Sequence, residues 1–375
     1  MVCFSSMGGS GIIATELGKL LADKGYQVHF IGHGVPFRLD KLSKNIFYHE
    51  VEVTDYPVFK GSPYDLALAN KIAEVAKMEQ LDLIHVHYAM PHAVCAFLAK
   101  QIVGDHLKIV TTLHGTDITI LGVDPTFKDL ICLALKKSDA VTAVSKDLVK
   151  EAQKLDNNMC NIDLTYNFVD ERLFHPRNND RLRAELGIGK DQVLLHASNF
   201  RPVKRVIDVI NIFALVNQKI PSTRLLLVGE GPDMRDCQKR LHELKSEKQV
   251  HFLSKEASMP HTFPLADVLL LPSEKESFGL VALEAMACGV PTVGSIAGGI
   301  PELVIHGETG FLAPIGDTKT MAEYTIQLLT DKVLMQQMSR QCLIHARTEF
   351  NRETMVNRYE QIYYRVLNRK MPEPS

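Results

Sequence analysis

The chain has 375 residues, of which 46% are hydrophobic and 23% charged, and its formal net charge is −2. This length favours two domains, and the composition is typical of a soluble globular protein. The near-neutral charge gives no reason to expect a nucleic acid or an anionic membrane surface as a partner. The sequence shows neither a bilayer-spanning apolar run nor a signal-peptide pattern, so we expect a cytoplasmic protein.

The cysteine pattern points to reduced thiols. Seven cysteines are scattered along the chain, and no two form a Cys-x-x-Cys pair. An odd, scattered set is expected in a reducing compartment, mostly as small buried side chains. No group of histidines and cysteines has the spacing of a zinc site, so we predict neither a metal site nor a cofactor.

Apolar runs rich in β-forming residues alternate with amphipathic helical patterns. Such alternation predicts parallel sheets covered by helices on both faces. The predicted strands are 27–32, 46–53, 81–87, 107–113 and 140–144 in the first half, and 192–197, 224–228, 249–252, 268–271 and 291–293 in the second. The predicted helices include 12–24, 63–77, 206–216 and 321–329.

The alternation pauses in a polar, turn-rich stretch at 155–190, which predicts a domain boundary near 167–176. We predict an α/β fold of two doubly wound, Rossmann-like domains, 1–168 and 169–350, that face a central cleft. A last helix, within 351–375, is expected to cross back towards the N-terminal domain. Ligands of such sheets bind beyond the carboxyl ends of the strands.

The run Gly8-Gly9-Ser10-Gly11 precedes the first predicted helix. Glycines allow close approach of a ligand, and a helix N-terminus offers free amide groups to an anion. The run lacks the spacing of a dinucleotide fingerprint, and a tight structural turn explains it equally well. Only residues 2–4 remain for the preceding strand, so we expect the chain start to be truncated or misassigned.

Two polar clusters follow neighbouring strands. They are HVHYAMPH at 85–92 and TTLHGTD at 111–117. Their side chains should meet at one sheet edge and form a binding site, although a lone histidine is more often a core residue. The residues placed at this edge are His87, Tyr88, His92, His114, Thr116 and Asp117.

A basic turn, ASNFRPVKR at 197–205, follows the first strand of the second domain. Its Arg201, Lys204 and Arg205 suit a diphosphate, by point charge and by fork geometry. Ordinary surface charge is the alternative.

The stretch SEKESFGLVALEA, at 273–285, holds two glutamates eight positions apart. Glu276 should lie in the loop before a helix that begins near Phe278–Gly279, and Glu284 two turns into it. Carboxylates accept hydrogen bonds from vicinal hydroxyls. One ligand would satisfy the whole arrangement: a sugar at Glu276, phosphates at Lys204 and the amides around Phe278, Gly279 and Leu280, and a ribose at Glu284. Two solvated glutamates are the alternative.

These motifs together resemble the retaining glycosyltransferases of the GT-B fold, family four. The glycine run, HGTD, the basic turn, the glutamate pair and the segment GGIPE at 298–302 occur in that order. The likeness covers nearly the whole chain. It implies a metal-independent glycosyltransferase that uses a nucleotide sugar.

Within the family, segments such as HVHYAMPHAVCA, SNFRPVKR and SEKESFGL are similar to those of members that glycosylate malate. The resemblance therefore implies UDP-N-acetylglucosamine as donor, L-malate as acceptor and a place at the first step of bacillithiol biosynthesis. No nucleic acid or membrane is implied as a partner, and a homo-oligomer is left open.

The resemblance also assigns roles. Glu276 would hold hydroxyls of the donor sugar, Glu284 the ribose and Lys204 the diphosphate, with His114 beside the sugar. Glu276, His114 and Lys204 form the predicted catalytic set. The predicted donor-binding residues are Gly9, Ser10, Gly11, Asn199, Arg201, Lys204, Glu276, Phe278, Gly279, Leu280 and Glu284, and the predicted acceptor-binding residues are Ser10, Tyr88 and Thr116.

Two departures from the family pattern stand out. Asn199 lies where the wider family usually has arginine, so Arg201 or Arg205 would supply that charge. Pro260 and Pro264 interrupt an expected helix before the strand 268–271, at the edge expected to bind the base. Two alternatives stay open: a UDP-N-acetylglucosamine 2-epimerase, which needs no acceptor, and a non-catalytic nucleotide-sugar-binding protein.

Overall fold

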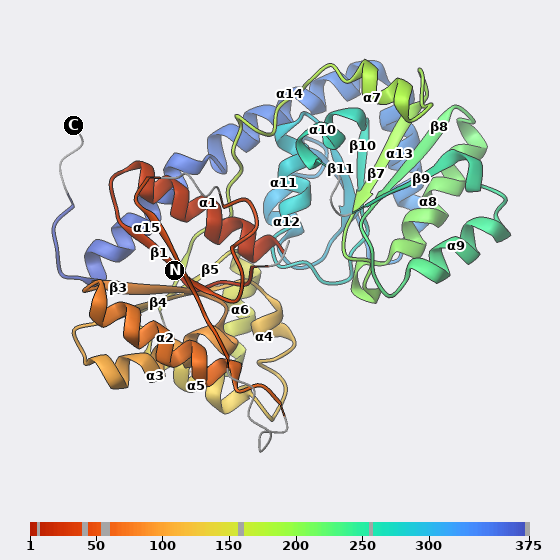
Figure 1. Cartoon of the computed structure of the whole chain (residues 1–375). Coiled ribbons are helices and arrows are strands. Elements are labelled where there is room, and N and C mark those ends of the chain that lie inside the picture. The colour runs from red at the N-terminus through yellow and green to blue at the C-terminus, as the bar shows by residue number, and fades with distance from the viewer. Residues whose placement is uncertain (6–7, 40–43, 54–60, 157–160, 255–257, 372–375) are drawn as a thin grey trace. The chain divides into compact units, whose positions relative to one another are not determined.

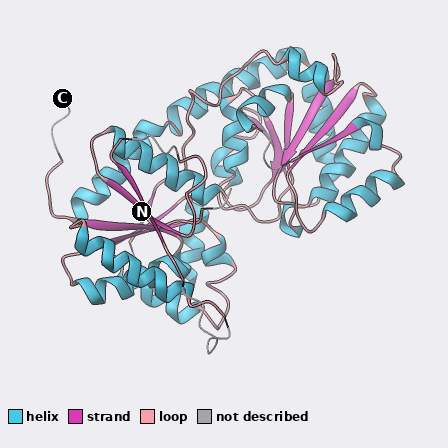
Figure 2. Ribbon diagram, in the orientation of Figure 1, coloured by secondary structure: helices cyan, strands magenta, loops and turns pink. Residues whose placement is uncertain are grey.

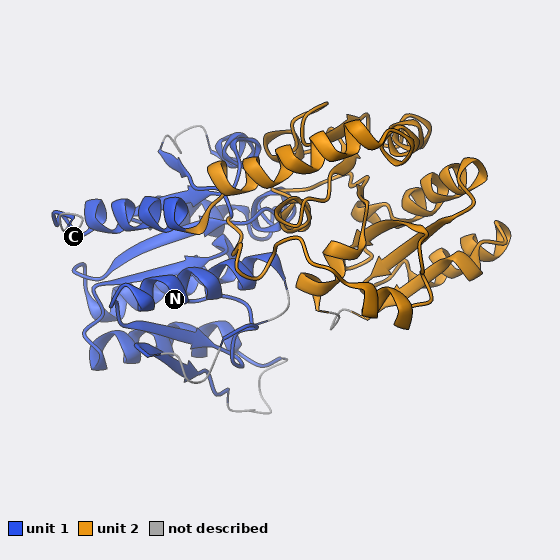
Figure 3. Cartoon of the chain, turned by 90° about the horizontal axis from the view of Figure 1, so that it is seen from above, with its two compact units in different colours: residues 1–167, 353–375 blue, residues 168–352 orange. Residues whose placement is uncertain are grey.

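The computed structural model describes residues 1–5, 8–39, 44–53, 61–156, 161–254 and 258–371. The chain divides into two compact units (Figure 3). Unit 1 comprises Met1–Asn167 with Glu353–Ser375, and unit 2 comprises Phe168–Arg352. Within the described ranges, every helix is too short or too polar to span a lipid bilayer.

Unit 1 contains a parallel sheet. Val2 forms single bridges to Ile31 and to Val86, and so lies between β1 and β3. The order across the sheet is therefore β2, β1, the Val2 segment, β3, β4, β5 and β6. The strands of unit 1 are β1 (Val28–Gly32), β2 (Ile46–Glu50), β3 (Leu83–His87), β4 (Lys108–Leu113), β5 (Ala140–Ala143) and β6 (Ile162–Leu164).

Helices flank the sheet of unit 1 (Figure 2). Small residues allow close packing: a Cβ added at Gly18 would lie 2.4 Å from the ring of Phe30 on β1. The last helix returns to unit 1, where the Tyr363 hydroxyl shares a 2.7 Å hydrogen bond with His85. The helices of this unit are α1 (Gly9–Asp23), α2 (Tyr64–Met78), α3 (Val94–Val103), α4 (Thr116–Thr119), α5 (Lys128–Lys137), α6 (Lys146–Leu155) and α15 (Arg352–Val366).

Unit 2 contains a six-stranded parallel sheet in the order β12-β11-β10-β7-β8-β9. The chain runs outward in one direction from β7 and in the other from β10, so the strand order reverses between these two neighbours. Such a reversal is where open α/β sheets bind ligands. The strands are β7 (Gln192–Ala197), β8 (Thr223–Val228), β9 (Val250–Leu253), β10 (Val268–Leu271), β11 (Thr292–Ser295) and β12 (Gly310–Ala313).

The strands of this second sheet other than the edge strand β9 are almost wholly buried, as expected for parallel strands covered by helices (Figure 1). Caps fix two helix starts, because the side chains of Asp317 and Asp331 accept hydrogen bonds from amides in the first turns of α13 and α14. The helices are α7 (Asp180–Glu185), α8 (Val206–Lys219), α9 (Met234–Glu243), α10 (Met259–Thr262), α11 (Leu280–Ala287), α12 (Ile300–Leu303), α13 (Thr318–Thr330) and α14 (Lys332–Glu349).

The predicted pair of doubly wound α/β domains is confirmed, and each predicted strand appears within a few residues of its expected bounds. The sequence analysis did not predict β6 and β12. Pro260 and Pro264 give a short α10 followed by a 3-10 turn at Phe263–Leu265, in place of one regular helix. The boundaries between units fall at 167/168 and 352/353.

Candidate active site

Tyr88 and Thr116, two of the predicted acceptor residues, lie together in unit 1. They follow β3 and β4, which pair in parallel, so both loops leave the same sheet edge. The Tyr88 hydroxyl shares a 2.7 Å hydrogen bond with Thr116 Oγ1. The Tyr88 ring also stacks on His114, with 5.7 Å between centroids. Tyr88 has φ of 99°, a strained conformation of the kind found at functional sites.

Asp117 holds these two loops in place. Its buried carboxylate accepts hydrogen bonds from the amides of Ala89 (3.0 Å), Gly115 (2.8 Å) and His114 (3.3 Å). Burial raises the pKa of Asp117, whereas the three amide hydrogen bonds oppose that rise. Because its oxygens are engaged by backbone amides, Asp117 positions the site and is poorly placed as a nucleophile.

His114 presents a neutral ring. Burial lowers the pKa of His114 to about 3. Its Nε2 lies 2.9 Å from His87 Nδ1, and His92 Nδ1 in turn contacts the His87 carbonyl oxygen at 2.5 Å. His87 and His92 are buried. They lie on the buried side of His114. Of these three predicted edge histidines, only the half-buried His114 therefore has an exposed part that a ligand could contact.

The glycine run begins α1 at Gly9, and the amide of Ile12 donates to the Gly8 carbonyl at 3.1 Å. Gly8, the N-cap, provides no side-chain cap, and the first turn carries no acidic residue. The amides of this turn are therefore available to an anion. Ser10 is half-buried and Gly11 buried. The run follows the Val2 segment, which neighbours β3, so it leaves the sheet beside Tyr88.

In unit 2, Lys204 and Glu276 form an ion pair of 2.6 Å, with side chains 19% and 16% exposed. Lys204 follows β7 and Glu276 follows β10, the two strands at which the strand order reverses. A hydrogen bond of 2.8 Å from the Glu274 amide to the Val203 carbonyl ties the two loops together. The predicted sugar-binding and phosphate-binding residues are therefore direct neighbours.

The other basic-turn residues differ in their partners. Arg205 is paired with Asp208 at 2.6 Å. The buried Nε of Arg201, by contrast, has no hydrogen-bond partner among the residues that the structure describes. Asn199 is exposed. Of the two arginines proposed to replace the missing family charge, Arg201 is the one whose donors are less committed.

Two glycines hold the Glu276 loop in place. The Gly299 amide donates to the Glu276 carbonyl at 2.8 Å. A Cβ added at Gly298 would lie 1.9 Å from that same carbonyl oxygen, and φ of Gly298 is +52°. The clash and the positive φ require glycine at position 298, because a side chain would push the loop aside and strain the backbone.

We expect Gly298→Ala to lower transferase activity about 100-fold, since a displacement of about 1 Å is enough for that loss. Gly307→Ala is the matched control: Gly307 also has positive φ (+83°), but a Cβ there would meet nothing within 4 Å. The test measures the initial rates of both variants at a temperature at which thermal melts show that both are folded. Equal activity would show that the loop tolerates the change.

Helix α11 begins at Leu280 with Gly279 as N-cap, one or two residues later than predicted. Its first turn has no side-chain cap, which leaves amides for an anion. Phe278 is buried and packs edge-on against Phe350, with 5.6 Å between ring centroids. Glu284 lies in the second turn and is only 6% exposed. The glutamates are thus on different elements, as the sequence predicted.

Two doubly wound domains with polar loops at the carboxyl edges of their strands are the architecture of the GT-B fold, to which many glycosyltransferases belong. Family models agree: "Glycosyltransferase Family 4" matches residues 7–173 and "Glycosyl transferases group 1" matches residues 178–342. The chain belongs to this family of glycosyltransferases and is an enzyme.

Two individual proteins are similar to this chain over most of its length. The chain is 50% identical over 368 residues to the N-acetyl-alpha-D-glucosaminyl L-malate synthase of Bacillus anthracis, covering 98% of this chain and 96% of that protein. It is 28% identical over 369 residues to a D-inositol 3-phosphate glycosyltransferase of Stackebrandtia nassauensis, covering 90% and 83%.

Solved structures agree on the fold. Anabaena Alr3699/HepE, crystallised with UDP and glucose, superposes with a TM-score of 0.80 at 22% identity, covering 96% of this chain and 97% of that one. A sucrose-phosphate synthase from Thermosynechococcus elongatus superposes with a TM-score of 0.78 at 23% identity, covering 96% and 94%.

Proposed function

We propose that the chain transfers N-acetylglucosamine from UDP-N-acetylglucosamine to the hydroxyl of L-malate, with retention at the anomeric carbon, as the first step of bacillithiol biosynthesis. The relationship to the malate synthase of Bacillus anthracis, which extends over nearly the whole of both chains, carries this proposal. The described cysteines are free, which fits a cytoplasmic enzyme.

The donor would bind to unit 2. Lys204 and Glu276 form an ion pair in the structure. A bound diphosphate would take Lys204, with help from Arg201 and the amides at the start of α11. Glu276, released from the lysine, would accept hydrogen bonds from hydroxyls of the sugar. Glu284 would hold the ribose.

Catalysis would come from offsetting charge on the leaving diphosphate. As the glycosidic bond breaks, negative charge grows on the phosphate beside Lys204, and a fixed cation there favours the transition state. The malate hydroxyl would attack from the face that UDP leaves, through an oxocarbenium-like state. A phosphate oxygen would accept the hydroxyl proton. We propose neutral His114 as a hydrogen-bonding neighbour of the sugar, since its low pKa makes it a poor proton donor near neutral pH.

These residues would supply the needed charge without a divalent cation. Adding Mg²⁺ or Mn²⁺ to the assay is therefore expected to leave the rate unchanged. A marked increase in rate would contradict this part of the proposal.

The decisive experiment measures UDP release over a panel of sugar donors and hydroxy acids. We expect release from UDP-N-acetylglucosamine only when L-malate is present, with D-malate a poor acceptor because its two carboxylates fix a wrongly placed hydroxyl. Epimerisation of the donor without malate would indicate an isomerase. Binding without turnover under any condition would indicate a non-catalytic protein.

We propose that Tyr88, Thr116 and Ser10 bind the malate dianion. Tyr88→Phe removes one hydroxyl donor and changes the shape little, so it should raise KM for malate by about 10-fold or more and leave KM for the nucleotide sugar nearly unchanged. Tyr324→Phe, on α13 in unit 2, serves as the control. Unchanged malate kinetics would move the acceptor pocket towards Ser10 and Thr116.

A further inference from the structure

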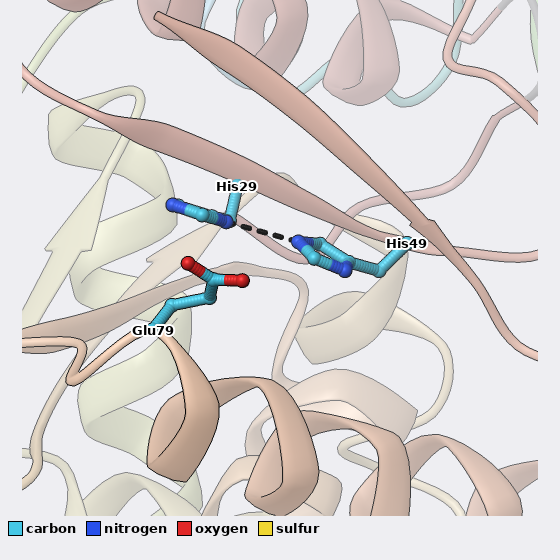
Figure 4. A group of neighbouring side chains, drawn as sticks. All are labelled: His29, His49 and Glu79. Atoms are coloured by element: carbon cyan, nitrogen blue, oxygen red, sulfur yellow. Dashed lines mark hydrogen bonds between the residues drawn. The ribbon is translucent and has the colours of Figure 1, made fainter.

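Two histidines and a glutamate come together in unit 1, away from the residues discussed above. His29 lies on β1, His49 on β2, and Glu79 directly follows α2 (Figure 4). The parallel register pairs His29 with Phe47 and Ile31 with His49, so the histidines are diagonal neighbours on one face of the sheet. Figure 4 shows the carboxylate of Glu79 beneath the two rings.

The three side chains are within reach of one ion. His29 Nδ1 and His49 Nε2 are 2.9 Å apart, and the rings are nearly parallel, with 17° between their planes. One nitrogen from each histidine and one Glu79 oxygen all lie within 4.8 Å of one another. Imidazole nitrogen and carboxylate oxygen are ligands that zinc and its first-row neighbours accept.

A second observation concerns the unused nitrogen of His29. The side chain is only 4% exposed, yet its Nε2 has no hydrogen-bond partner among the described residues. The ion would bind Nδ1, the nitrogen that faces His49, so Nε2 would carry the proton of the ring and would not itself be a ligand. His29 and Glu79 also line a cavity of about 400 Å³, through which an ion could enter.

The charge state of the cluster suits a cation. Burial lowers the pKa of both His29 and His49, so both rings are neutral near pH 7, the form that binds metal. Glu79 adds a negative charge beside them. Lys71 opposes a cation here and Glu74 favours it, so these two charges offset each other. Burial lowers the pKa of the Met1 amino group to about 6, so this group is mostly neutral near pH 7.

We propose that His29, His49 and Glu79 bind a divalent transition-metal ion, Zn²⁺ in the first place, with water completing the coordination. Zn–N bonds of about 2.0–2.1 Å at a tetrahedral angle put two nitrogens roughly 3.3 Å apart, so the rings need to separate by only about 0.4 Å. Two bonds to the ion replace their mutual hydrogen bond, and the proton of the donor ring moves to the other nitrogen of that ring.

The position indicates a structural role. Glu79 precedes β3, whereas Tyr88 and His114 follow β3 and β4, so the cluster lies towards the other end of the strands. A bound ion would tie β1, β2 and the end of α2 together. Its effect should appear in stability and not in the chemistry of sugar transfer, which makes this proposal independent of the proposed reaction.

The test uses the full chain, stripped of metal and titrated with Zn²⁺ and, as a spectroscopic probe, Co²⁺. The wild type should bind one equivalent and gain thermal stability with Zn²⁺. His49→Gln and Glu79→Gln should weaken binding at least about 100-fold, since even outer-shell changes cost 10- to 100-fold. His106→Gln, which removes an exposed histidine of the same unit, should bind as the wild type does.

Three results would overturn the proposal. One is the absence of a stoichiometric site in the wild type, which would leave His29 and His49 as a hydrogen-bonded pair only. Another is equal zinc affinity in His49→Gln and the wild type. The third is a thiolate-to-Co²⁺ charge-transfer band, which would place the ion on cysteines. Circular dichroism of each variant before titration separates loss of the site from loss of the fold.

Discussion

Replacing Glu276 with alanine is expected to lower kcat/KM for UDP-N-acetylglucosamine by about 10- to 150-fold, before any misalignment of the sugar is counted. The figure corresponds to one charge-assisted hydrogen bond of about 1.5–3 kcal/mol. Misalignment of the anomeric carbon would add to the loss. UDP alone should bind Glu276→Ala at least as tightly as the wild type, because Lys204 no longer has the carboxylate as a competing partner.

Two controls make this result specific. Glu274→Ala removes an exposed glutamate from the same loop and should retain activity. Glu276→Gln keeps the shape of the side chain and removes its charge, so its kcat/KM should lie between that of Glu276→Ala and that of the wild type. Near-wild-type UDP release by Glu276→Ala would remove Glu276 from the site.

Much of the fold could be predicted because buried parallel strands appear in the sequence as continuous apolar runs. β7 and β10 were predicted with their observed bounds, Gln192–Ala197 and Val268–Leu271. β6 was missed because it has only three residues, and β12 because it begins with a glycine, a residue that is rare in strands. The start of α11 was placed slightly early, since Gly279 serves as its N-cap.

The sequence supplies candidate site residues, whose roles remain predictions, but it does not supply the contacts between them. Strand-end placement gave Tyr88, Thr116, Lys204 and Glu276. The direct pairing of Lys204 with Glu276 depends on β7 and β10 being neighbours, which no local pattern reveals.

The positioning role of Asp117 and the cluster of His29, His49 and Glu79 could not be predicted either, because each involves a contact between residues far apart in the sequence. The engagement of Asp117 by three backbone amides follows from loop geometry that side-chain chemistry alone does not indicate. The group of His29, His49 and Glu79 draws on three separate elements, so its spacing matches no metal-binding motif.

Lys204→Ala is expected to weaken UDP binding and slow turnover together. In the proposed mechanism, the diphosphate contacts the lysine in the ground state and gains charge as the bond breaks, so both binding and the transition state would lose a cation. Calorimetry should show UDP affinity lower by about 10-fold or more, the cost of one charge-assisted contact. Lys239→Ala, on α9, is the control for a general change in surface charge.

A double variant, Lys204→Ala with Glu276→Ala, tests whether the two residues act together or independently. Lys204 and Glu276 are in direct contact, so their effects on turnover should be less than additive when both are changed. Their effects on UDP affinity should differ in kind: loss in Lys204→Ala, none in Glu276→Ala. Unchanged UDP affinity in Lys204→Ala would show that the basic turn is ordinary surface charge and that the ion pair only holds the Glu276 loop. A loss of affinity in Lys204→Ala alone would identify the lysine as the diphosphate contact and the glutamate as the residue that faces the sugar.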